Sequence, residues 1–131
     1  MSPLIHLRFI LLAALALFLA IPVARAEGDH CPDNPKATST FNPADNDFQA
    51  ERDRLAALAR PAAKAGGVCI LAFYDPDNVG PTKKLAISHA TWARDLLVRK
   101  GVPRNQISIE LRAVQGADKT TLHSFQVILG H

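Results

Sequence analysis

Residues 68–74, VCILAFY, form an unbroken run of apolar side chains. Such a run is typical of a strand covered on both faces, because a half-exposed strand would carry a polar side chain at every second position. An acidic turn, DPDNVG at 75–80, follows the run at once. The sequence therefore predicts a buried strand that ends in two carboxylates, and the role of this turn is the main functional question.

The first 26 residues have the pattern of a signal peptide. Arg8 provides a positive charge ahead of an apolar stretch of 15 residues, FILLAALALFLAIPV, and ARA at 24–26 matches a cleavage site. The stretch is shorter than the roughly 20 apolar residues of a spanning helix. We expect cleavage before Glu27 and no membrane span after it, with an uncleaved anchor as the alternative. Cys31 lies too far beyond Ala26 to become a lipid-anchored N-terminus.

The exported part is long enough for one modest domain. Without residues 1–26, 105 of the 131 residues remain, with 13 Lys and Arg against 12 Asp and Glu. The charges are scattered, and the longest basic runs are Lys83-Lys84 and Arg99-Lys100. A nucleic-acid partner would call for a basic stripe interleaved with aromatic residues. The sequence therefore predicts no nucleic-acid partner.

Cys31 and Cys69 are the two cysteines of the chain. Export would place them in an oxidising compartment, where a bridge closing a loop of 38 residues would stabilise the fold by about 4 kcal/mol. The alternative is that Cys69, between Val68 and Ile70, is simply a small buried side chain. Two cysteines without a histidine pair nearby do not predict a zinc site, and we expect no metal and no cofactor.

The segment before the apolar run predicts one strand and one helix. Residues 27–37 contain two prolines and many polar groups, and indicate an irregular lead-in. TSTF at 38–41 is a short strand, and apolar residues from Phe48 to Ala62 recur at helical spacing. Asn46 and Gln49 resemble a capping box at the start of this helix. Pro61 should end or bend it near residue 60.

The segment after the acidic turn predicts a long helix and two strands. The helix should begin at Pro81 and end before Gly101, with two mostly apolar rows: Leu85, His89, Trp92 and Leu96, and beside them Ala86, Ala90, Ala93 and Leu97. ISIELRA at 107–113 alternates as a half-buried strand does, and residues 125–129 alternate again after a polar connection. The order β-α-β-α-β-β indicates an α+β fold with a mixed sheet.

Two chemical interpretations of the acidic turn each lack a part that the chemistry requires. Asp75-x-Asp77 after an apolar strand resembles the opening motif of haloacid-dehalogenase-type phosphatases, in which one aspartate is the nucleophile and the other a general acid/base. A second acidic cluster for the metal is missing from the sequence. A calcium loop that begins at Asp75 would place Ala86, which is no ligand, at its twelfth position.

From about Thr38 onward the chain resembles the OmpA-like C-terminal domain, the module that anchors outer-membrane proteins to peptidoglycan. The family has an apolar strand, a Thr-Asp turn with glycine three residues later, and a helix that carries Asn, Leu-Ser and Arg-Ala and ends in Gly-Val or Gly-Ile. This sequence has ILAFYDPDNVG followed by KLAISHATWARDLLVRKGVPRNQISI, and FNPADNDFQAERDRLAAL before them. The resemblance implies an OmpA-like domain over 38–131, with helices packed on one face of the sheet.

The resemblance also implies a binding site. In the family, the aspartate of the turn and the arginine of the helix hold the charged amino-acid end of the peptidoglycan stem peptide, since a carboxylate and a guanidinium suit its ammonium and carboxylate groups. Asp77 matches that aspartate, with Asp75 as a rival. A gapless match back from Gly101 puts His89 at the arginine and Thr82 at the asparagine.

The predicted function follows from these matches and departures. We expect a periplasmic or secreted cell-envelope domain, not an enzyme, whose binding of the stem peptide through Asp77, Asp75 and His89 is weakened or lost. One alternative is a scaffold that lost the ligand and binds an envelope protein, and another is a small phosphatase-like hydrolase that uses Asp75 and Asp77.

Overall fold

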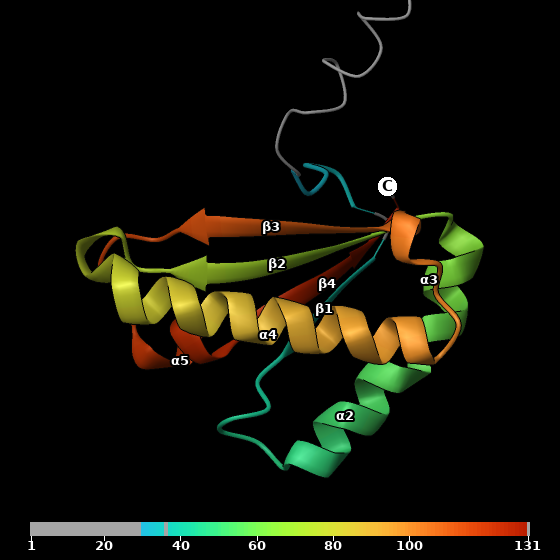
Figure 1. The fold of residues 1–131 in the computed structure, drawn as a ribbon, viewed down its shortest axis with the longest axis horizontal. Helices are drawn as coiled ribbons and strands as arrows, with labels where there is room; N and C mark the ends of the chain where they lie inside the picture. Colours follow the sequence, from blue (N-terminus) through green and yellow to red (C-terminus); the bar gives the residue numbers. More distant parts are fainter. Residues whose placement is uncertain (1–29, 36, 131) are drawn as a thin grey trace, which may run out of the picture.

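The computed structural model of the chain describes residues 30–35 and 37–130 (Figure 1). The predicted signal peptide, residues 1–26, lies outside the described residues. The elements are β1 (Ala37–Phe41), α2 (Phe48–Ala57), α3 (Ala59–Ala65), β2 (Val68–Tyr74), the 3-10 turn η1 (Pro76–Asn78), α4 (Val79–Arg99), the 3-10 turn η2 (Arg104–Gln106), β3 (Ile107–Ala113), α5 (Lys119–His123) and β4 (Phe125–Leu129).

The strands form one mixed sheet in the order β1-β4-β2-β3. β2 and β3 are parallel and are connected through α4, whereas β4 runs antiparallel to both β1 and β2. The predicted α+β class and the predicted mixed sheet are confirmed.

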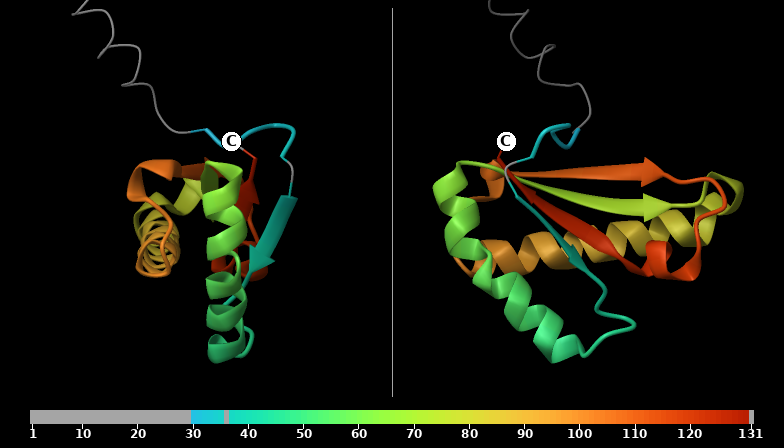
Figure 2. Two further views of the ribbon diagram at one scale, coloured as in Figure 1. Left: turned by 90° about the vertical axis from the view of Figure 1, so that its right-hand side faces the viewer. Right: turned by 180° about the vertical axis from the view of Figure 1, so that it is seen from behind.

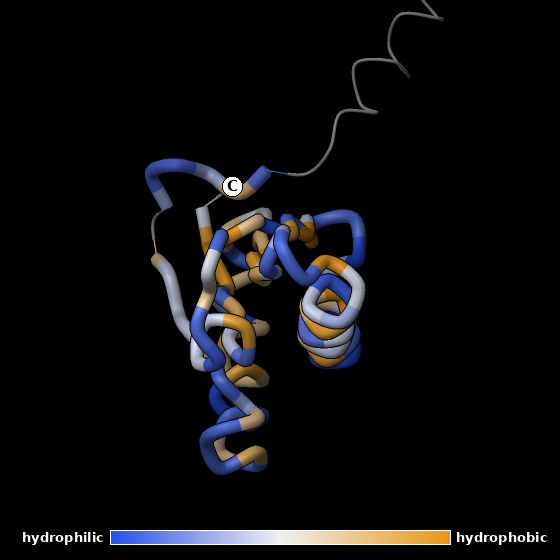
Figure 3. The backbone as a smooth tube through the Cα atoms, turned by 90° about the vertical axis from the view of Figure 1, so that its left-hand side faces the viewer, coloured by the Kyte–Doolittle hydropathy of each residue, from blue (hydrophilic) through white to orange (hydrophobic). Residues whose placement is uncertain are grey.

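The helices pack on one face of this sheet, with α4 lying along it (Figure 2). Val68, Ile70 and Ala72 of β2 belong to the core on the helix side. From α4, the row of Ala86, Ala90, Ala93 and Leu97 is buried against them. In the other row Leu96 is also buried, whereas Leu85, His89 and Trp92 are only partly buried. Figure 3, which looks along α4, shows hydrophobic and hydrophilic segments alternating around this helix, as expected when one side is buried.

The opposite face of the sheet is tied to the lead-in. Cys31 and Cys69 form a disulfide with an S–S distance of 2.05 Å, which confirms the predicted bridge. The backbone N–H of Cys31 donates to Oε1 of Glu110 on β3 at 2.7 Å, and Nε of Arg112 donates to Oε2 at 2.7 Å. Burial by itself would raise the pKa of Glu110, but these two hydrogen bonds hold it below its usual value. The disulfide and Glu110 together fix the lead-in across β2 and β3.

The helical region before β2 differs from the prediction. Two helices, α2 and α3, replace the single helix expected to end or bend near residue 60, and the break lies at Leu58, three residues ahead of Pro61. Pro61 stands in the first turn of α3, where a missing backbone N–H removes no intrahelical hydrogen bond. The proline therefore marks the start of a helix and not the end of one.

Other helix boundaries were displaced or missed. The N-cap of α2 is Asp47, whose Oδ1 accepts from the N–H of Ala50 at 2.8 Å, so the predicted capping box at Asn46 was wrong by one residue. α4 begins at Val79, two residues before the predicted start. The segment predicted only as a polar connection between the last two strands contains α5, whose N-cap is Asp118. Within residues 30–35 and 37–130, no helix is both long and apolar enough to cross a membrane.

Candidate functional site

The acidic turn caps its own backbone. Asp75 directly follows β2, and its Oδ1 accepts from the N–H of Asp77 at 2.9 Å, which closes the start of η1. Pro76 supplies the first residue of this 3-10 turn, where no N–H is needed. One oxygen of the Asp75 carboxylate is therefore engaged in shaping the turn. This contact accounts for an aspartate at position 75 without any bound ligand.

Thr82 connects the turn to the first turn of α4. Its Oγ1 accepts from the N–H of Asp75 at 3.0 Å and lies 2.6 Å from the carbonyl oxygen of Asn78, to which it can donate. Thr82 occupies the position of the family's asparagine, according to the resemblance. In this chain its hydroxyl group holds the acidic turn against the helix.

Asp77 is the more accessible carboxylate of the turn. The residue is exposed, and its Oδ2 lies 3.4 Å from Nε2 of Gln115, which is itself exposed and belongs to the connection after β3. A contact of this length between exposed groups is weak. Asp77 therefore keeps most of its capacity to accept hydrogen bonds from a ligand.

His89 lies in a different environment, an open groove of about 340 Å³ between α4 and the segment after β1. The groove is lined by Pro43, Ala44, Phe48, Ser88, His89 and Trp92. The ring of His89 is 6.0 Å from that of Phe125 beneath it. Its Nδ1 is buried and has no hydrogen-bond partner among the described residues. We call this groove, defined by its six lining residues, the His89 groove.

The predicted site residues lie along one side of α4 but do not share a pocket. Thr82, which holds the acidic turn, and His89 are seven residues apart, which places them on the same helix face at a separation of about 10 Å along the axis. The lining of the His89 groove includes neither Asp75 nor Asp77. A ligand that touched both ends would have to extend over about two turns of α4.

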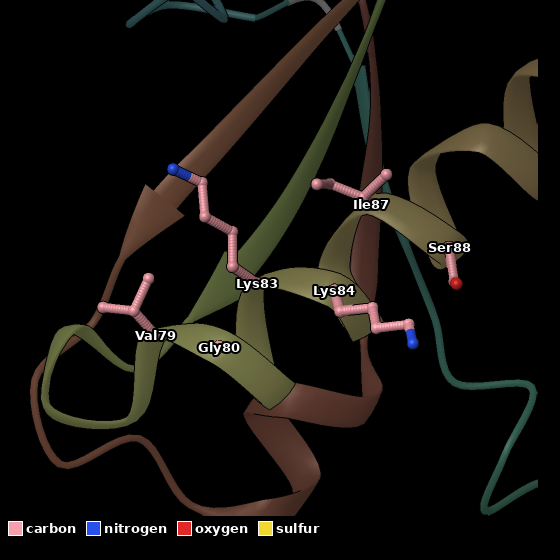
Figure 4. Close-up of a pocket in the computed structure, with 6 residues that line it drawn as sticks. All are labelled: Val79, Gly80, Lys83, Lys84, Ile87 and Ser88. Carbon is pink, nitrogen blue, oxygen red and sulfur yellow. The ribbon is translucent and has the colours of Figure 1, made fainter.

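A second depression lies on the outer face of α4 and is lined by Val79, Gly80, Lys83, Lys84, Ile87 and Ser88 (Figure 4). All six residues come from one helix, so the depression is shallow and open. Val79 and Ile87 are 45% and 49% exposed there. Nζ of Lys83 lies 5.2 Å from the centre of the Tyr74 ring, within the range of a cation–π contact. This surface is apolar with a basic rim.

The pairing of Asp45 with His123 was not predicted from the sequence. Nδ1 of His123, at the end of α5, lies 3.1 Å from Oδ1 of Asp45, in the segment between β1 and α2. The two residues are 78 positions apart, so no local pattern could join them. Within residues 30–35 and 37–130, no three His, Cys, Asp or Glu side chains are grouped so that they could hold a metal ion. The phosphatase alternative therefore gains no second acidic cluster from the described residues.

Acidification should destabilise the fold through His89. Burial lowers the pKa of His89 below the usual 6.5, and the nearby His123 lowers it further. The unfolded chain therefore takes up a proton at pH values where the folded chain does not. As a result, the free energy of unfolding keeps its full value above about pH 6.5 and decreases as the pH falls from there through the lowered pKa of His89. We expect the urea midpoint to fall between about pH 7.5 and pH 5.5.

The variant His89→Gln should flatten this pH dependence, because glutamine does not titrate. Ser88→Ala, one residue away, is the matched control and should keep the slope of the parent chain. An unchanged slope in His89→Gln, measured by urea unfolding at each pH, would assign the effect to another group.

No family model matches this chain, and no curated protein sequence matches it. Its structure is similar to the periplasmic domain of Helicobacter pylori MotB, with 16% identity over 69% of this chain and 66% of that one, at a TM-score of 0.49. A second structure of that periplasmic domain gives 17% identity over 66% of this chain and 61% of that one, at a TM-score of 0.48. The chain thus spans less than two thirds of either MotB structure.

The OmpA-like domain of FopA1 from Francisella tularensis is also similar, with 12% identity over 79% of this chain and 89% of that one, at a TM-score of 0.49. Structural similarity at such low identity and TM-score supports no conclusion about function. The function therefore has to be inferred from the residues of this chain.

Proposed function

We propose that the chain is a non-catalytic domain of the cell envelope, periplasmic or secreted, that binds the peptidoglycan stem peptide weakly along α4. The observation that supports this most is the place of His89. It occupies the position of the arginine in the OmpA-like resemblance, and it opens onto a groove with an aromatic floor. Asp77 is exposed at the start of the same helix.

The imidazole of His89 explains why binding should be weak. A neutral imidazole has one N–H donor, whereas a guanidinium has five and a permanent charge. Because burial lowers its pKa, His89 is uncharged at neutral pH. A carboxylate of the ligand would therefore find no charge-assisted, bidentate partner at this position.

Retention on purified sacculi tests the proposal. We expect weak retention of the exported chain at neutral pH and stronger retention well below pH 6.5, where His89 gains a proton. Asp77→Asn should reduce retention at both pH values, and Asp95→Asn, at the other end of α4, is the matched control for loss of one negative charge. A folded chain that sacculi fail to retain at either pH would refute the proposal.

The outer face of α4 favours one other candidate, a scaffold that binds an envelope protein. Val79 and Ile87 are large exposed apolar side chains, and Lys83 and Lys84 lie beside them. Exposed apolar residues with a polar rim are typical of protein-interaction surfaces. A stoichiometric partner that co-purifies with the chain, but not with an Ile87→Glu variant, would support this candidate, and a strictly solitary monomer would count against it.

A further inference from the structure

The described residues that line the His89 groove carry no permanent charge. They are a proline, an alanine, a phenylalanine, a serine, a histidine and a tryptophan. The histidine is neutral at neutral pH, because burial lowers the pKa of His89 and the nearby His123 lowers it further. A charged ligand group would lose its hydration in this groove without meeting an ion of opposite charge in the lining. The lining therefore favours an uncharged and largely apolar ligand.

The apolar part of the groove is aromatic and accessible. The ring centroids of Phe48 and Trp92 are 5.5 Å apart and the rings are tilted by 42°, so neither ring lies flat on the other. Phe48 is 53% exposed although its side chain is large and apolar, and Trp92 is half-buried. The core supports Trp92 from below, because the fully buried Phe125 packs against it edge-on at 6.1 Å. A ligand thus meets a ring that the core holds in place beside a ring that faces solvent.

The polar side chains of the groove can all donate hydrogen bonds. Ser88 has a hydroxyl group, Trp92 has an indole N–H that can only donate, and a neutral His89 has one N–H. Nδ1 of His89 is buried and has no partner among the described residues, so Nε2 is the ring nitrogen that can face a ligand. The described lining includes neither a carboxylate nor a side-chain amide. A ligand that offers acceptors and few donors would be complementary to this set.

A proline-rich segment in the polyproline II conformation has these properties. Proline lacks a backbone N–H, so the segment presents apolar rings and carbonyl oxygens that have no internal hydrogen bonds. Aromatic-lined grooves bind such segments, and the restricted conformation of proline lowers the entropy lost on binding. A sugar is also uncharged and can lie on aromatic rings, but its hydroxyl groups donate as well as accept. Because the described lining has no carboxylate or amide to receive them, it favours the proline-rich segment.

We infer that the His89 groove docks a proline-rich segment of another exported protein. In this arrangement proline rings lie against Phe48 and Trp92, and carbonyl oxygens of the segment accept from Ser88 and His89. The inference goes beyond the proposed function and does not depend on it, because neither peptidoglycan nor Asp77 takes part. It assigns a second class of ligand to the groove, and the two ligands would compete wherever both reach His89.

The tryptophan of the groove provides the measurement. Trp92 is the one tryptophan of the chain, so its fluorescence reports on this groove. The exported chain, with its disulfide formed, is titrated with decaproline that is blocked at both ends and therefore uncharged. A blocked Gly-Ser peptide of the same length is the flexible comparison. We expect decaproline to change the fluorescence saturably and to bind about tenfold more tightly than the Gly-Ser peptide, because its conformation is already restricted.

The salt dependence distinguishes this binding from an ionic contact. Neither decaproline nor the described lining of the groove is charged at neutral pH. The midpoint of the titration should therefore change by less than about twofold between about 0.05 M and about 0.5 M NaCl, whereas contacts between exposed ions weaken as salt screens them. A midpoint that rose steeply with salt would contradict recognition of an uncharged segment and overturn the inference.

Variants assign the binding to the groove. Phe48→Ala should weaken decaproline binding by about two- to tenfold, which corresponds to the loss of one aromatic contact. Ile87→Ala is the matched control, because Ile87 is also a large apolar side chain, 49% exposed on α4, but lies outside the groove. Ser88→Ala removes one donor and should also weaken binding by about two- to tenfold. The urea midpoint of each variant checks that the fold is kept, and Phe48→Leu replaces Phe48→Ala if the alanine variant unfolds.

The outcomes separate this inference from the proposed function. No saturable change with decaproline, equal binding of the Gly-Ser peptide, or a folded Phe48 variant that binds as the parent does would overturn the inference, even when sacculi retain the chain. A response to the neutral disaccharide di-N-acetylchitobiose without a response to decaproline would assign the groove to sugars and overturn it too. If decaproline binds as expected but sacculi fail to retain the chain, the inference stands and the proposed function is refuted.

Discussion

The variant His89→Arg is expected to bind sacculi about ten- to a hundredfold more tightly than the parent chain, because a hydrogen bond to a charged group contributes about 1.5–3 kcal/mol. Position 89 lies on the half-buried side of α4 and opens onto the groove, so an arginine there can extend its guanidinium to the groove mouth. The guanidinium would supply the bidentate partner for a ligand carboxylate that imidazole lacks.

The matched control is Ile87→Arg. It adds the same charge to the same helix, but Ile87 is 49% exposed and lines the outer depression instead of the His89 groove. A sacculus-binding isotherm for each variant distinguishes a specific site from general attraction to an anionic wall. Equal increases for both variants, or none for His89→Arg in a folded chain, would contradict the assignment of His89 to the binding site. The increase should also persist at neutral pH, since arginine remains charged there.

Loss of the Cys31–Cys69 bridge is expected to lower the free energy of unfolding by about 4 kcal/mol, the chain-entropy value for a closed loop of 38 residues. Both cysteines are buried, and Cys31 is in the apolar cluster with Leu71 and Ile128 on the face opposite the helices. Without the bridge, the hydrogen bond from the backbone N–H of Cys31 to Glu110 would still connect the lead-in to that face. The unfolded chain would also be less constrained.

Urea unfolding of the oxidised chain and of a Cys31→Ala, Cys69→Ala double variant measures the difference. A reductant should shift the midpoint of the parent chain towards that of the variant and leave the variant unchanged. Ser108→Ala on β3 serves as a control for small changes beside the bridge, because Ser108 pairs with Cys69 in the sheet. Equal midpoints for the parent and the double variant would show that the bridge contributes nothing.

Much of the fold could be predicted from local patterns. The apolar run 68–74 and the alternation in 107–113 each correspond to a strand with those bounds. The end of α4 was predicted by Gly101, which adopts a φ of 106° that a side chain would oppose. The shorter helices escaped prediction for physical reasons. α5 has five residues, too few to show helical periodicity, and the break at Leu58 has no glycine or proline to mark it.

The site was less accessible to sequence reasoning than the fold. His89 was identified through its position relative to Gly101, but its surroundings come from three separate parts of the chain. Phe48 lines the same groove, Phe125 packs against its ring, and His123 lies near it, because β1 and β4 are neighbours and α5 packs against α4. The place of Asp77 in η1, just before α4, follows from local order alone, because the strand, the turn and the helix succeed one another directly. Contacts between distant segments decide the chemistry of the groove.

The last strand of the chain, β4, lies in the interior of the sheet, between β1 and β2. Until residues 125–129 are available, the described part of the chain offers β1 no neighbouring strand, and the two halves of the sheet stay separate. Completion of the four-stranded sheet therefore depends on contacts between residues far apart in sequence, and such contacts form late in folding. A nascent polypeptide of this kind therefore cannot complete its sheet before residues 125–129 have emerged and can pair with both β1 and β2.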